Sequence, residues 1–320
     1  MGTRRCSAIG VAGALVVICS SVGWADSQTG PSDHSRVSDV IYGRKFGVAL
    51  TLERFVPSKP NGFGIVWVVS SGGRSSREHT LQPSFERRIS PFLAHGYTVF
   101  AVIHGSAPAF HLQDFEHDVR RAVRFVRHRA SEFSIDPQRL AIAGSSAGGL
   151  LALMVATHAR DGDPKAEDAV DRVSDRVQAV GCFFAPTDLT NYGQGALNIL
   201  DFMRQQAGVV DPTFEFYETE SKTGTRRAIT DRERVRELLR EMSPTTHVTA
   251  DDPPTILVHG DQDQGVPVQQ SRQLLERLTQ ANVPARLVLR EGKGHAWAGW
   301  ESDSALLAEW FDTHLRGGRP

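Results

Sequence analysis

Cysteine is scarce in this chain: it has 3 in 320 residues, and Cys6 and Cys19 lie in an N-terminal segment that we expect to be removed. Cys182 then has no partner for an intramolecular disulfide, even in an oxidising compartment. Because it lies in the apolar run at 180–184, we predict that it is a core residue. A chain of this size can bury enough apolar surface to fold without a covalent cross-link.

The sequence also lacks a surplus of either charge. Its 36 Lys and Arg nearly balance its 37 Asp and Glu, which gives a formal net charge of -1. A nucleic-acid-binding protein usually carries a basic patch or a basic excess, so nothing here suggests a nucleic-acid partner. The 12 histidines are scattered, with no His-Glu-x-x-His, His-x-His or Cys/His cluster. We therefore expect neither a metal nor a cofactor.

The N-terminus has the form of a secretory signal peptide. Arg4 and Arg5 precede an apolar run at 8–19, and Gly23 and Ala25 offer small residues for cleavage. We therefore predict a signal peptide at 1–25 and export to the periplasm or the extracellular space. The apolar run is too short to span a bilayer comfortably, so no stable membrane insertion is expected after cleavage. A lipoprotein site at Cys19 and a twin-arginine route are weaker alternatives.

Beyond the signal segment, the chain alternates between short apolar runs and helical patterns. Residues 26–44 are polar and rich in serine, so we interpret them as a loose N-terminal arm, with a single domain at 45–318. Strands that alternate with helices predict an α/β fold: a mostly parallel central sheet covered by helices on both faces. The predicted strands lie at 47–52, 65–69, 98–102, 140–143, 177–184, 255–258 and 285–289.

A clear amphipathic helix is predicted at 114–130. Its apolar residues recur at helical spacing on one face, and its arginines lie on the other, which we interpret as a solvated face. The apolar set is Phe115, Val119, Ala122, Val123, Val126 and Ala130, and the arginines are Arg120, Arg121, Arg124, Arg127 and Arg129.

The alternation breaks between about 191 and 242. This stretch of about 50 residues contains several aromatic residues, a Gly/Thr-rich turn at 223–225 and one further helical pattern. We interpret it as an insertion that acts as a small lid. The alternative is a surface excursion that only caps the core.

A candidate nucleophile stands at Ser146. Residues 139–143 read as a buried strand, residues 149–156 read as an apolar helix, and Gly-Ser-Ser-Ala-Gly lies between them. This is the context of a nucleophile elbow, a strained turn that presents one serine hydroxyl. Side chains at Gly144 or Gly148 would collide across so tight a bend. Ser145 is the neighbouring alternative, but the glycine spacing favours Ser146.

A serine nucleophile needs a base and an acid. His295 lies in a glycine-framed loop after the last predicted strand, and Asp263 lies in the loop after the strand at 255–258. The chain order Ser, Asp, His is that of α/β-hydrolases. The carboxyl ends of parallel strands share one crevice, so these loops can meet. Asp261 and Asp188 remain alternatives for the acid.

These motifs resemble the esterase/lipase branch of the α/β-hydrolase superfamily, close to its hormone-sensitive-lipase-like and BD-FAE-like members. The resemblance extends over about 46–315 and rests on Ile-Asp-Pro-Gln-Arg-Leu-Ala-Ile at 135–142, His-Gly-Asp-Gln-Asp-Gln-Gly-Val-Pro at 259–267 and Gly294-His295. It implies an α/β-hydrolase fold in which the second aspartate of the 259–267 loop is catalytic.

The oxyanion loop departs from that family. Its members usually carry His-Gly-Gly-Gly after the third strand, whereas this chain has Ser-Ser-Gly-Gly-Arg at 70–74. The chemistry needs backbone N–H groups and the conformational freedom of glycine, not an imidazole. We therefore predict an oxyanion hole from Gly72, Gly73 and Ala147.

The sequence thus predicts an exported serine carboxylic-ester hydrolase of the EC 3.1.1 class that acts on small or carbohydrate-linked acyl esters. Ser146, His295 and Asp263 would form and hydrolyse an acyl-enzyme. The expected partner is a small-molecule ester substrate, and the oligomeric state is open. The alternatives are a prolyl-oligopeptidase-like serine peptidase and a non-catalytic binding protein that retains the fold.

Overall fold

A sheet of 8 strands runs through the part of the chain that the computed structural model describes, residues 34–193, 195, 197–220 and 222–317. The strand order is β1-β2-β4-β3-β5-β6-β9-β10; β1 and β2 pair antiparallel, as do β2 and β4, and the other pairs are parallel. The strands are β1 (His34–Lys45), β2 (Val48–Pro57), β3 (Gly64–Val69), β4 (Thr98–Ile103), β5 (Leu140–Ser145), β6 (Ala179–Phe183), β9 (Thr255–Gly260) and β10 (Ala285–Arg290). The α/β-hydrolase fold class is confirmed.

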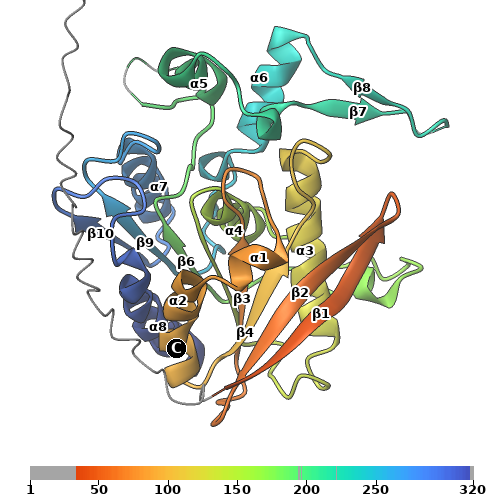
Figure 1. The fold of residues 1–320 in the computed structure, drawn as a ribbon, viewed down its shortest axis with the longest axis vertical. Coiled ribbons are helices and arrows are strands. Elements are labelled where there is room, and N and C mark those ends of the chain that lie inside the picture. Colours follow the sequence, from red (N-terminus) through yellow and green to blue (C-terminus); the bar gives the residue numbers. More distant parts are fainter. Residues whose placement is uncertain (1–33, 194, 196, 221, 318–320) are drawn as a thin grey trace, which may run out of the picture. The chain divides into compact units, whose positions relative to one another are not determined.

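Helices cover both faces of this sheet (Figure 1). One apolar cluster packs α3 (Leu112–His128), α4 (Ala147–Thr157) and α7 (Gln269–Gln280) against one face. A second cluster packs α2 (Pro83–Ala94) and α8 (Ser304–Phe311) against the other, and α1 (Arg77–Thr80) is a single turn before α2. In the described residues, none of the helices is both long and apolar enough to cross a membrane.

The predicted insertion holds its own small elements. They are α5 (Ile199–Ala207), the hairpin of β7 (Tyr217–Thr219) and β8 (Arg226–Ala228), and α6 (Arg232–Glu241). Figure 1 shows these elements at the top of the view, above the central strands. Sequence reasoning missed the hairpin, because strands of 3 residues are too short to show an alternating pattern.

The prediction of a loose arm at 26–44 is wrong for the part that the structure describes. Residues 34–44 belong to β1, an edge strand that pairs with β2. An edge strand buries only one side, so its exposed positions can be serine and aspartate, which made the segment look like a linker. Tyr42 anchors it: the ring is buried, and its hydroxyl donates to the carbonyl of Ile103 at 3.1 Å. The predicted signal peptide at 1–25 lies outside the described residues.

The core confirms the predictions for Cys182 and for the helix at 114–130, and corrects the prediction for one arginine of that helix. Cys182 is fully buried, and burial raises the pKa of its thiol well above the ordinary range. The helix at 114–130 is α3, with its apolar face in the core. The prediction that its arginines are solvated is wrong for Arg120, whose side chain is 3% exposed. Its guanidinium folds back onto Glu116 and lies 3.2 Å from the fully buried Asp175, a partner that helical periodicity cannot reveal.

We expect Arg120→Ala to lower the free energy of unfolding by about 3 kcal/mol, because it removes the buried cation that Glu116 and Asp175 share and leaves Asp175 with Arg124 alone. Arg129→Ala is the matched control: Arg129 follows the same helix, but its ion pair with Glu132 is exposed. Such a pair contributes less than about 1 kcal/mol. Urea unfolding of both variants measures the difference. Equal small losses would show that the Arg120 cluster does not stabilise the core.

Candidate active site

Ser146 lies in the sharp turn between β5 and α4. Its backbone has φ 52° and ψ -123°, a strained conformation for a residue with a side chain. A Cβ on Gly144 would lie 2.3 Å from the carbonyl oxygen of Gly148, and one on Gly148 would lie 2.6 Å from that of Val68. The predicted collision across the bend is therefore confirmed for Gly144, whereas a side chain on Gly148 would collide with the neighbouring strand β3; the turn is a nucleophile elbow in geometry.

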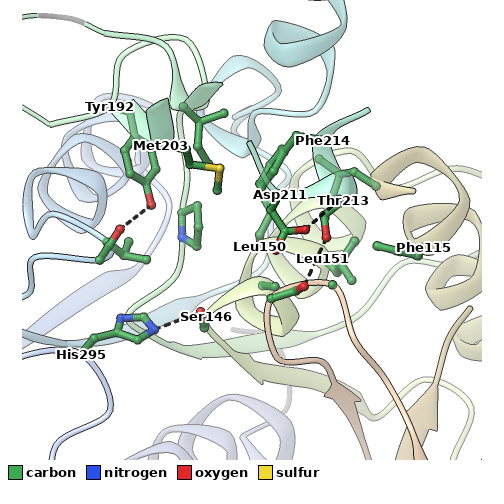
Figure 2. Close-up of a pocket in the computed structure, with 18 residues that line it drawn as sticks. Phe115, Ser146, Leu150, Leu151, Tyr192, Met203, Asp211, Thr213, Phe214 and His295 are labelled. Atoms are coloured by element: carbon green, nitrogen blue, oxygen red, sulfur yellow. Dashed lines mark hydrogen bonds between the residues drawn. The ribbon is translucent and has the colours of Figure 1, made fainter. Parts of the chain in front are cut away.

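Sheet topology brings the predicted site residues together. Ser146 follows β5, Asp263 follows β9 and His295 follows β10, and these strands lie on the same side of the parallel sheet, with β6 between β5 and β9. The Ser146 hydroxyl donates to Nε2 of His295 at 3.1 Å, and Nδ1–H of His295 donates to Oδ2 of Asp263 at 2.7 Å. Figure 2 shows the His295 ring directed at Ser146.

The other candidates for the acid and the nucleophile, Asp261, Asp188 and Ser145, make no hydrogen bond to the side chain of His295 in the described structure. Asp261 accepts a hydrogen bond from the N–H of Gly292 at 2.8 Å, which pins the base of the histidine loop. Asp188 caps its own turn and accepts from the N–H of Thr190 at 2.9 Å. Ser145 is buried at the end of β5. Of the two candidate serines and three candidate aspartates, only Ser146 and Asp263 hydrogen-bond to the imidazole of His295.

The Asp263 carboxylate is buried yet held in its charged form. Burial alone raises its pKa, but hydrogen bonds from His259, His295 and the N–H of Val266 outweigh that effect and hold the pKa well below its usual range. Oδ1 accepts from the N–H groups of Gly265 at 2.9 Å and Val266 at 2.8 Å. An ionised carboxylate can only accept, so the proton of His295 is on Nδ1 and Nε2 is free to accept from Ser146.

His259 is the first residue of the motif at 259–267, but the sequence alone assigns it no role. It is fully buried; its Nε2 lies 2.8 Å from the carbonyl of Val266 and 3.3 Å from Oδ2 of Asp263. The carbonyl can only accept, so Nε2 carries the proton. The hydroxyl of Ser271 then donates to Nδ1 at 2.7 Å. His259 therefore holds a donor against the same carboxylate oxygen that binds His295.

Phe184 is a second residue that the sequence did not single out. It follows β6 with φ 37°, a left-handed conformation, and its buried ring packs against His295 at 4.6 Å between ring centroids. The preceding residue, Phe183, accepts the backbone hydrogen bond of Ser146 at 2.9 Å. The end of β6 thus supports both the serine and the histidine.

The loop at 70–74 forms a tight turn with glycine at both central positions. Ser71 and Arg74 exchange backbone hydrogen bonds of 2.9 and 3.0 Å, while Gly72 and Gly73 have φ of 53° and 73°. Both values favour glycine. Within the described residues, the N–H groups of Gly72, Gly73 and Ala147 donate to no protein acceptor. They line the same cavity as Ser146.

The insertion holds this loop in place. The Thr213 hydroxyl donates to the carbonyl of Gly72 at 3.2 Å. A Cβ on Gly73 would lie 1.9 Å from the Oγ1 atom of Thr213, so only glycine fits beneath this side chain. Thr213 is buried and had no signal in the sequence, because it belongs to a segment without a recognisable pattern.

An apolar cavity opens beside Ser146. It has about 670 Å³ of empty space, with the open solvent at its mouth included. Its walls come from α3 and α4, from the insertion, and from the loops that carry Gly72, Gly265 and His295 (Figure 2). The lining side chains of the insertion are Tyr192, Ile199, Met203, Asp211, Thr213 and Phe214. In the described residues, no group of His, Cys, Asp and Glu is arranged to hold a metal ion.

Comparison with curated proteins finds esterases. The chain is 30% identical over 196 residues to the probable carboxylic ester hydrolase LipM of Mycobacterium tuberculosis, which covers 60% of this chain and 41% of LipM. It is 29% identical over 166 residues to the esterase LipQ of the same organism, which covers 52% of this chain and 34% of LipQ. The matched segments thus span less than half the length of these relatives.

Solved structures share the fold. A carbohydrate esterase from gut microbiota, in truncated form, superposes with a TM-score of 0.70 at 20% identity and covers 90% of this chain and 99% of that one. An acetyl ester-xyloside bifunctional hydrolase from Caldicellulosiruptor lactoaceticus gives 0.65 at 22% identity, with 86% and 96% covered. A model of the BD-FAE family matches residues 55–278, which confirms the resemblance seen in the sequence: the chain belongs to the BD-FAE family.

Proposed function

We propose that this protein is a serine carboxylic-ester hydrolase that acts on small or carbohydrate-linked acyl esters through an acyl-enzyme. The observation that carries the proposal is the hydrogen-bonded series from Asp263 through His295 to Ser146, at the edge of an apolar cavity. Nucleophile, base and acid in this geometry are what acyl transfer requires.

Each residue has a defined part in the reaction. As the Ser146 oxygen attacks the ester carbonyl, Nε2 of His295 takes its proton, and the ionised Asp263 stabilises the imidazolium. The oxyanion of the tetrahedral intermediate accepts from the N–H groups of Gly72, Gly73 and Ala147, each worth about 3 kcal/mol. Nε2–H then protonates the leaving alcohol. Water, deprotonated by His295, attacks the acyl–Ser146 ester, and the acid departs as Ser146 regains its proton.

The relatives support an ester rather than an amide. LipM and LipQ are described as ester hydrolases, and two structural neighbours are described as a carbohydrate esterase and an acetyl ester-xyloside hydrolase. A further neighbour, esterase Est2 of Thermogutta terrifontis, binds butyrate in one structure, with a TM-score of 0.63 and 22% identity. The apolar lining of the cavity beside Ser146 suits a short acyl group.

The proposal extends to the insertion and to export. Residues 191–242 supply side chains to the cavity and act as the lid that shapes the substrate pockets. The arginines, apolar run and small residues of 1–25 support removal of that segment as a signal peptide during export.

Ser146→Ala should reduce the hydrolysis of 4-nitrophenyl acetate by at least about a thousand-fold, because it removes the attacking oxygen. Steady-state release of 4-nitrophenolate measures this, with dipeptide 4-nitroanilides as the amide comparison. Ester turnover that survives in Ser146→Ala would overturn the proposal. Ser146-dependent turnover of the amides would favour the peptidase alternative.

Asp263→Asn should reduce kcat by about 10⁴-fold, since the neutral amide no longer fixes the proton of His295 on Nδ1. Asp261→Asn and Asp188→Asn are matched controls at the other candidate acids. They should stay within about threefold of wild type, the range of a change that does not touch the reacting groups. A large loss in either control, with near-normal rates for Asp263→Asn, would assign the acid role to that residue.

Gly73→Ala should reduce kcat by about 10²- to 10³-fold with little change in KM, because the added methyl group collides with Thr213 and displaces an oxyanion donor. Gly224→Ala is the matched control: its φ of 70° is equally left-handed, but a Cβ there meets nothing within 4 Å. Both variants bear similar backbone strain, so only Gly73→Ala should lose activity. An unchanged kcat would remove the loop at 70–74 from the oxyanion hole.

A further inference from the structure

Asp211 places a carboxylate in the wall of the active-site cavity. Most of the lining is apolar. Apart from Ser146 and His295, Asp211 is the ionisable residue among the described lining residues that has a polar side-chain atom without a hydrogen bond. The hydroxyl of Tyr192 is engaged, since it donates to the carbonyl of Gly265 at 3.2 Å. Figure 2 shows the Asp211 carboxylate next to Thr213.

The position of Asp211 is fixed by its neighbours. Its Oδ1 accepts from the N–H of Thr213 at 2.8 Å and so begins a short 3₁₀ turn at Pro212–Phe214. Nδ1–H of the buried His111 donates to the carbonyl of Pro212 at 2.9 Å, and Thr213 is tied to Gly72. The segment is thus anchored to both α3 and the loop at 70–74, so the carboxylate is held in place before a substrate arrives.

The second oxygen of this carboxylate has no partner in the described chain. Oδ2 makes no hydrogen bond or ion pair with the described residues, and it lies 4.0 Å from the position that a Cβ on Gly72 would occupy. It therefore lies next to the loop that we assign to the oxyanion. Capping the turn needs only one side-chain acceptor, which a serine Oγ or an asparagine Oδ1 could also supply.

A carboxylate in this place favours some substrates over others. It repels the negative charge of the oxyanion. When bound substrate closes the cavity, the carboxylate also loses its hydrogen bonds to water, and only a hydrogen-bond donor on the substrate can replace them. Simple acyl chains and simple alcohols carry no donor near the ester. A polyhydroxylated alcohol carries a hydroxyl on the adjacent carbon, and a hydroxyl hydrogen bond to a charged acceptor is among the stronger ones.

We propose that Asp211 is a specificity-determining residue whose Oδ2 accepts a hydrogen bond from a free hydroxyl next to the scissile ester. The preferred substrates are then partly acylated polyols or carbohydrates with that neighbouring hydroxyl unblocked. This inference rests on the proposed ester hydrolysis and narrows its substrate class.

The test compares two acetate esters that differ in one donor. Ethylene glycol monoacetate carries a free vicinal hydroxyl, whereas 2-methoxyethyl acetate has an ether oxygen at the same position, which accepts but cannot donate. Wild type should hydrolyse the hydroxyl ester with a kcat/KM at least about tenfold higher, because a site built to accept a hydrogen bond discriminates against a ligand that lacks the donor.

Asp211→Asn should bring this ratio to within about threefold of one. Thr213 N–H still needs an acceptor at Oδ1, so the amide nitrogen takes the place of Oδ2, and an N–H donor serves hydroxyl and ether oxygens equally. Asp231→Asn is the matched control: Asp231 caps α6 in the same way, accepting from the N–H of Arg234 at 2.8 Å, but lies outside the cavity lining. It should keep the wild-type ratio.

The outcomes are distinct. The role of Asp211 is overturned if the ratio of kcat/KM for the hydroxyl ester to that for the methoxy ester is near one in wild type, or is equal in wild type and Asp211→Asn. In that case, Ser146-dependent turnover of 4-nitrophenyl acetate would still support the proposed hydrolase. Absence of that Ser146-dependent turnover overturns the proposed function itself. If Asp211→Asn does not fold, Asp211→Ser keeps the cap and lacks Oδ2, and it should give the same collapse of the ratio.

Discussion

The buried, ionised carboxylate of Asp263 is the constraint on which the rest of the site depends. Its charge would be unfavourable at this depth without donors, and the structure provides them from His259, His295 and two backbone N–H groups. The same hydrogen bonds set the tautomer of His295 and so direct a basic nitrogen at Ser146. The loop after β9 must therefore stay closed around Asp263 for the serine to have a base.

The insertion is coupled to the site by direct contacts. Thr213 binds the loop at 70–74, Tyr192 binds the loop that carries Asp263, and Asp211 faces the cavity between them. In this chain the turn at 70–74 has glycine at its two positions of positive φ, and Thr213 of the insertion packs against it from the other side. We therefore propose that the same short segment both selects the substrate and supports the oxyanion loop.

The parts of the fold and site that the sequence predicted are those governed by local rules. The elbow at Ser146 follows from glycine sterics, and the strand ends explain why His295 and an aspartate meet it. The family resemblance favoured Asp263 as the acid, but Asp188 and Asp261 also follow strands, and only the structure shows which carboxylate contacts His295. The edge strand β1 was missed since one exposed side permits polar residues, and Arg120 was misplaced since its partner Asp175 is distant in sequence. Asp211 and Thr213 lie in an insertion where no periodicity assigns a role.

Covalent modification by a 4-nitrophenyl phosphonate tests directly whether Ser146 is the nucleophile, because the reagent attaches to an activated serine and mimics the tetrahedral intermediate. Intact-mass measurement with peptide mapping locates the adduct and 4-nitrophenolate release counts it. We expect a single phosphonyl group per chain, on the oxygen of Ser146. Modification at Ser145 or elsewhere, or a folded protein that remains unlabelled at neutral pH, would contradict this expectation.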